Sequence, residues 1–129
     1  MLNGNTLIKQ FRHETETWKR TLGFIEEENI ILKNRLSEIL ATANKYDDSL
    51  ISTLEIFQNS FIDKDDLIKL LKDNITEEDK LLTREAFEDG SLLTFVKNKQ
   101  KKLRKDMEEI EQKFQKLKTD FNSYLSDIY

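Results

Sequence analysis

Residues 6–50 read TLIKQFRHETETWKRTLGFIEEENIILKNRLSEILATANKYDDSL and carry one uninterrupted apolar seam. Its members are spaced by alternating steps of three and four residues: Ile8, Phe11, Thr15, Trp18, Leu22, Ile25, Asn29, Leu32, Leu36, Ile39, Ala43, Tyr46 and Leu50. Such spacing keeps one stripe of a helix facing its neighbours along the whole length of the helix. The stretch therefore predicts a helix over about residues 6–46, and this helix needs partner helices to cover its seam.

The rest of the chain repeats this pattern twice. The second seam contains Leu50, Leu54, Phe57, Phe61, Lys64, Ile68, Leu71 and Ile75, and the last contains Leu93, Val96, Gln100, Leu103, Met107, Ile110, Phe114, Leu117, Phe121, Tyr124 and Ile128. Between them, Thr76-Glu77-Glu78-Asp79 resembles a capping box, which marks the start of a helix. We therefore expect the middle rod to break into helices at about 48–73 and 76–89. Gly90 would end the second of these, and Ser91 would cap a last helix at about 91–127.

Three rods of nearly equal length that are joined by short turns run up, down and up. The predicted fold is all-α: a single domain over residues 1–129, built as an elongated antiparallel up-down-up helical bundle with coiled-coil-like heptad packing. It has three long rods and, because the middle rod is broken, four helices. The composition agrees, because 36% charged and 37% apolar residues with no Pro and only 3 Gly are typical of long amphipathic helices.

The composition also argues against several classes of protein. The chain has no Cys, which excludes a disulfide framework, a thiolate zinc site and a cysteine nucleophile. A net charge of -4 gives no general attraction to nucleic acid or anionic lipid. The N-terminus lacks the features of a signal peptide, and no apolar run approaches the roughly 20 residues of a membrane span. We expect a cytoplasmic protein that does not associate with membranes.

Candidate catalytic groups are few. His13 is the only histidine, and a carboxylate-bridged di-iron bundle needs two, so we interpret it as a surface residue. The strongest enzymatic pattern is a pair of Glu-x-x-Glu elements, Glu85 with Glu88 and Glu108 with Glu111. It resembles the pair with which all-helical nucleotide pyrophosphohydrolases hold magnesium, and this resemblance would imply a metal-dependent nucleotide hydrolase. Glu108 would lie about 27 Å along the last helix from the turn beside Glu88, too far to share a metal. We therefore expect no enzymatic activity, no metal and no cofactor.

Two polar residues, Asn29 and Lys64, interrupt the seams at nearly the same height of the predicted bundle. Buried polar groups need partners. We therefore expect Asn29 to lie within hydrogen-bonding distance of residues 64–66 and to fix the register of the rods. The alternative interpretation is that Lys64 extends its ammonium group to solvent.

The positions of charged residues predict the same alignment of the three rods along the bundle. The basic run at residues 97–105 falls at the height of Glu14 and Glu16 on the first rod and of residues 77–79 on the middle rod. Residues 26–28, which are all Glu, fall near Lys69 and Lys72 and near Lys113 and Lys116. Because exposed ion pairs contribute little to stability, we expect these contacts to set register.

Apolar residues outside the seams are the clearest functional signal. Phe24 and Ile31 share one outward position of the first rod, and Ile56 and Leu70 share the equivalent position of the second. A stripe on neighbouring rods favours a contact surface. We therefore expect a non-catalytic scaffold or adaptor that binds a second copy of itself or another helical protein. Ordinary partial burial, by a wider core or by a fold-back of the third helix, is the alternative.

A second function is suggested by the basic run. Lys97, Lys101, Arg104 and Lys105 form a candidate anion patch for a nucleic-acid accessory protein, with Phe95 near enough to stack on a base. Helix geometry spreads these charges over several faces, and acidic neighbours neutralise part of them. We therefore favour a protein partner over nucleic acid and expect no small-molecule ligand.

Overall fold

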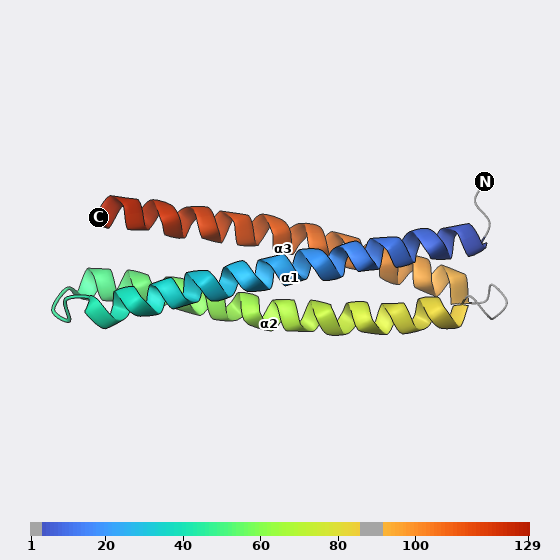
Figure 1. Cartoon of the computed structure of the whole chain (residues 1–129), viewed down its shortest axis with the longest axis horizontal. Helices are drawn as coiled ribbons and strands as arrows, with labels where there is room; N and C mark the ends of the chain where they lie inside the picture. The colour runs from blue at the N-terminus through green and yellow to red at the C-terminus, as the bar shows by residue number, and fades with distance from the viewer. Residues whose placement is uncertain (1–3, 86–91) are drawn as a thin grey trace.

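The computed structural model describes residues 4–85 and 92–129. They form three long helices that lie side by side, α1 (Gly4–Thr42), α2 (Asp48–Glu85) and α3 (Leu93–Ile128). Figure 1 shows the chain running along α1, returning along α2 and running back along α3, so that α1 and α3 point the same way. The predicted all-helical bundle is thus confirmed, with no strand among the described residues.

The predicted break of the middle rod is wrong, because α2 continues from Asp48 to Glu85 as one helix. The apolar seam does not stop at Ile75, which is fully buried, but goes on through Glu78 to Leu82. Thr76, the expected cap, instead donates its hydroxyl to the carbonyl oxygen of Lys72 at 3.0 Å, as threonines inside helices do. Burial of the seam therefore outweighs the local capping signal. The predicted end of that helix at Asp89, the Gly90 turn and the Ser91 cap lie outside the described residues.

The first helix is shorter than predicted, because α1 ends at Thr42 and not near residue 46. Tyr46, which the seam placed in the core, is 94% exposed. A turn follows, in which the amide of Asp47 donates to the carbonyl oxygen of Asn44 at 3.0 Å. Asp47 then accepts a hydrogen bond from the amide of Leu50 at 3.0 Å, so it caps α2.

The core follows the seams and is divided into two clusters. The larger cluster runs from Trp18 of α1, Ile75 of α2 and Leu103 of α3 to the far end of the bundle. There α3 packs on α2 through Phe57 and Phe61, whose ring centroids each lie 5.2 Å from that of Phe121. The smaller cluster contains Ile8, Phe11, Leu82 and Val96 at the other end.

The predicted charge register is present in part. Arg104 of the basic run pairs with Glu14 at 2.7 Å, and Lys72 pairs with Glu26 at 2.7 Å. The partner of Glu28 on α3 is Lys118 at 2.8 Å, not Lys113 or Lys116 as predicted. Lys116 pairs within its own helix, with Asp120 at 2.8 Å. The contact between Glu28 and α3 therefore lies further along α3 than the sequence indicated.

Candidate functional site

A layer of three polar side chains separates the two core clusters. Thr15 lies on α1 between Phe11 and Trp18, Glu78 lies on α2 between Ile75 and Leu82, and Gln100 lies on α3 between Val96 and Leu103. All three are completely buried. Each helix therefore contributes one residue to the layer, at the same height of the bundle.

Two members of the layer are hydrogen-bonded. The Thr15 hydroxyl donates to Asp79 Oδ1 at 2.7 Å. Gln100 Nε2 donates to the carbonyl oxygen of Phe11 at 3.2 Å and to Glu14 Oε1 at 2.8 Å. The third member differs, because neither carboxylate oxygen of Glu78 has a hydrogen-bond partner among the described residues, and the same holds for Gln100 Oε1.

Ion pairs border the layer on two sides. Arg104 donates to both carboxylate oxygens of Glu14 at 2.7 Å and so links α3 to α1. Burial acts to raise the pKa of Glu14, but hydrogen bonds from Arg104 and Gln100 outweigh it, so the pKa is lowered. On the other side Lys19 pairs with Asp79, and this hydrogen bond raises the pKa of the Lys19 ammonium.

Burial raises the pKa of Glu78 to about 7, because the charged form has lost its hydration. The positive charge of Lys99 acts against this effect, and the negative charge of Asp79 adds to it. Lys99 forms no hydrogen bond to Glu78; its Nζ lies 5.6 Å from the centroid of the Phe95 ring. The layer thus accommodates a neutral Glu78 better than a charged one.

The polar contact predicted at Asn29 is present, although not through Lys64. Asn29 Nδ2 donates to Asp65 Oδ1 at 2.7 Å and to the carbonyl oxygen of Phe61 at 3.0 Å. Lys33 pairs with the second oxygen of Asp65. Lys64 is half-buried and has no hydrogen bond or ion pair to another described residue. The role of Asn29 in fixing register stays a prediction.

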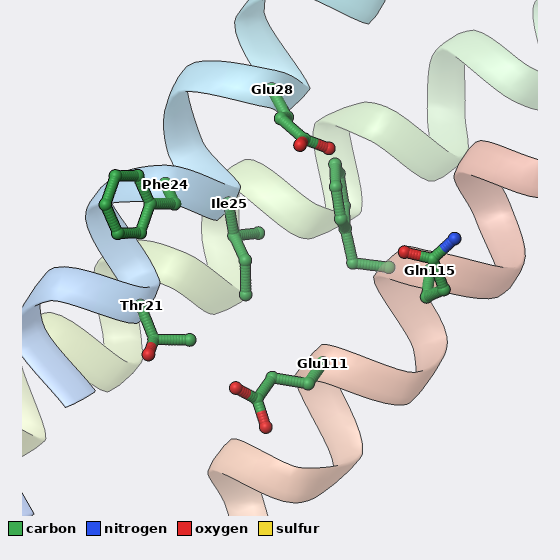
Figure 2. A pocket seen from close by; sticks show the side chains of 7 residues that line it. Thr21, Phe24, Ile25, Glu28, Glu111 and Gln115 are labelled. Atoms are coloured by element: carbon green, nitrogen blue, oxygen red, sulfur yellow. The ribbon is translucent and has the colours of Figure 1, made fainter. Parts of the chain in front are cut away.

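A shallow groove of about 240 Å³ lies between α1 and α3, which are the least closely packed pair of helices. It is lined by Thr21, Phe24, Ile25 and Glu28 of α1 and by Glu111, Phe114 and Gln115 of α3. Figure 2 shows Ile25 and Glu28 of α1 on the side toward α3, with Glu111 facing them from α3, whereas the ring of Phe24 lies farther from α3 than Ile25 does. A second groove of about 410 Å³ lies nearer the N-terminus of α1 and is lined in part by Phe11, His13, Trp18 and Arg104.

The four predicted interface residues are all more than half exposed, so the bundle's own core does not cover them: Phe24, Ile31, Ile56 and Leu70. They do not form one stripe. On α1, Glu28 contacts α3, and Phe24 and Ile31 lie further round the helix on the same side, away from the core. On α2, Phe57 contacts α3, and Ile56 and Leu70 likewise lie further round that helix on the side of α3. Since α3 lies between them, helical geometry places the two pairs on different sides of the bundle.

The candidate anion patch is partly neutralised. Lys97, Lys101 and Lys105 are exposed on α3. Arg104 is held by Glu14, however, and is therefore neutralised in part. The four cations do not converge on one described pocket, since Arg104 is the only one of them that lines a groove.

The predicted Glu-x-x-Glu pairs can be compared only in part. Glu88 and the side chain of Glu85 lie outside the described residues, whereas Glu108 and Glu111 are exposed on α3. Among the side chains that the structure describes, no three of the ligand types His, Cys, Asp and Glu come together as a metal site. None of the described helices has an apolar stretch long enough to cross a membrane.

Comparison with known proteins found no matching family model, no matching curated protein and no matching solved structure.

Proposed function

We propose that this protein is a non-catalytic helical bundle that acts as a scaffold or adaptor, and that its groove between α1 and α3 binds a second copy of the chain. The observation that carries the proposal is the exposure of Phe24, which is 68% accessible at the edge of that groove. Burying such a side chain stabilises a complex by about 1.5–3 kcal/mol. The heptad spacing of the seams supports coiled-coil-like packing within each copy.

The charges of α3 favour a second copy as the occupant. One flank of α3 contacts α1 through two ion pairs, Arg104 with Glu14 and Lys118 with Glu28. Along this flank, spaced by three or four residues, Lys97 and Lys101 come before Arg104, and Glu108 and Glu111 come after it. The flank is therefore basic at its start and acidic near its middle.

An antiparallel copy would align these charges with their opposites. Lys97 and Lys101 of one molecule would approach Glu108 and Glu111 of the other, which is the self-complementary arrangement of a two-fold dimer. In this arrangement Arg104 and its partner Glu14 lie at the two-fold axis, so the second groove, which Phe11 and Trp18 line, faces its own copy. Phe24 of each molecule lies about 15 Å from this axis along α1, opposite the start of α1 in its partner. The charge pairs and the apolar surface of the second groove thus agree on one orientation.

Light scattering tests this proposal at protein concentrations of about 1 and 100 µM, which bracket a micromolar dissociation constant. We expect the wild type to approach a dimer at the higher concentration and to dissociate as salt is added, because exposed charges are screened. Phe24→Glu combined with Ile31→Glu should leave a monomer. Ile56→Glu combined with Leu70→Glu is the matched control, since it adds the same charges on the other side of α3.

A wild type that is monomeric at both concentrations would exclude the second copy as the occupant. Loss of the dimer in the control pair, with the Phe24 and Ile31 pair unaffected, would move the interface to the other face. Oligonucleotide binding at low salt that is lost on Lys97→Glu and Lys101→Glu would instead favour the nucleic-acid function.

A further inference from the structure

The polar layer of Thr15, Glu78 and Gln100 divides off a short end of the bundle. This end contains residues 6–14 of α1, 79–85 of α2 and 92–99 of α3. Its buried apolar side chains are Ile8, Phe11, Leu82 and Val96, with Leu7, Leu81 and Leu93 half-buried against them. The larger cluster has many more members. Because local stability follows the apolar surface that a segment buries, this end is the less stable part of the described core.

The groups around Glu78 do not compensate a negative charge. From α1, Glu14 and Lys19 border the layer, but each already has a partner on another helix, Arg104 and Asp79 respectively. From α2, Asp79 adds like charge. From α3, the Arg104 guanidinium is committed to Glu14, and Lys99 acts on Glu78 through its charge without a hydrogen bond.

We infer that Glu78 is a proton-controlled switch for this end of the bundle: its neutral form lets the three helices close, and its charged form separates them and exposes the small cluster. The physical reason is that a buried carboxylate without a partner must regain water, and the layer can admit water only if the end opens. A neutral carboxyl also provides a hydroxyl donor in a layer whose free polar atoms are acceptors. Burial raises the pKa of Glu78 to about 7, which places the change near neutral pH.

Thiol labelling measures the opening directly, because the chain has no Cys of its own. Val96→Cys places a thiol in the small cluster, and Ile110→Cys places one in the larger cluster; both parent residues are fully buried. Labelling by a disulfide reagent, corrected for thiol ionisation with a free peptide, reports the opening equilibrium. If Glu78 has an ordinary pKa of 4.5 in the open state and about 7 in the closed state, linkage predicts about a 40-fold increase in opening from pH 5 to pH 7.

We expect this increase at Val96→Cys and not at Ile110→Cys. It should disappear when Glu78→Gln is added and persist when Glu77→Gln is added, since Glu77 is the adjacent exposed carboxylate. Equal pH profiles for the two thiols, or a pH response that survives Glu78→Gln, would overturn the inference.

Trp18 gives a second measurement that needs no introduced thiol. It is the only Trp and is buried in the larger cluster immediately beside the layer. Quenching of its fluorescence by acrylamide, a neutral quencher, should increase from pH 5 to pH 7 in the wild type and stay constant in Glu78→Gln. Quenching that is independent of pH in the wild type would contradict the inference even if the thiol variants failed to fold.

Discussion

Substituting Glu78 should change how the stability of the protein depends on pH. In the folded chain the pKa of Glu78 is about 7, against 4.5 for an ordinary glutamate. Between these values the unfolded chain has lost the proton that the folded chain still holds, so raising the pH favours unfolding. The contribution of Glu78 to stability is therefore fully present below pH 4.5, is lost up to about pH 7 and stays constant above it.

The size of this loss follows from the same pKa difference. A tenfold change in proton affinity corresponds to about 1.4 kcal/mol, so the free energy of unfolding should fall by about 3 kcal/mol across this range. This value is an upper limit, because opening of the short end would return water to the carboxylate and relieve part of the penalty. For a domain of this size, about 3 kcal/mol corresponds to roughly 10 °C in the melting temperature.

Urea unfolding at pH 5, 6, 7 and 8 measures the effect. We expect Glu78→Gln to gain stability relative to the wild type as the pH rises, whereas Glu77→Gln should follow the wild type. At pH 8, Glu78→Leu should be more stable than the wild type and than Glu78→Gln, because an apolar side chain at this position joins the two core clusters. A wild type and a Glu78→Gln variant whose stabilities remain parallel from pH 5 to pH 8 would refute the reasoning, since Glu78 would then titrate alike in the folded and unfolded chains.

Three further predictions concern single positions. Gly23→Ala should stabilise α1 by about 0.5–1 kcal/mol in thermal melts, because an added Cβ meets no atom within 4 Å and helix interiors favour Ala; a destabilised variant would reveal a close helix contact there. A double-mutant cycle of Asn29→Ala and Asp65→Ala should give a coupling energy of about 0.5–3 kcal/mol in urea unfolding, and additive effects would contradict a shared contact. Because the pKa of Glu14 is lowered, its contribution to stability is present above pH 4.5 and lost on acidification, so acid titration of Glu14→Gln should show a smaller loss below pH 4.5 than the wild type. Identical acid profiles would argue against the Glu14 pair with Arg104 in solution.

The sequence predicted the bundle because the seams dominate its folding. A helix-long row of apolar residues has one stable arrangement, and the antiparallel order follows from rods of equal length. Capping signals are weaker. Thr76-Glu77-Glu78-Asp79 satisfied a local pattern, but Ile75 and Leu82 are both completely buried, and a break between them would expose apolar surface.

That one wrong boundary also hid the polar layer. Thr15 and Gln100 were placed in the core by their spacing, but Glu78 was assigned to the start of a separate helix. Continuing the seam of Leu71 and Ile75 by steps of three and four reaches Glu78 and then Leu82, and this signal was available in the sequence. The pKa of Glu78 could not be predicted in this way, because it depends on how completely the packed helices bury the carboxyl and on how near the charges of Lys99 and Asp79 lie to it.

The unequal packing of the three helices also predicts an order in which the chain assembles. α1 and α2 are the most closely packed pair, and the short turn at residues 43–47 joins them. Such a hairpin needs little loop-closure entropy, so we expect it to form first and α3 to dock on it afterwards. Substitutions on the α3 surface that faces α1 should therefore act mainly on the unfolding rate, which gives this protein a kinetic lifetime set by its last helix.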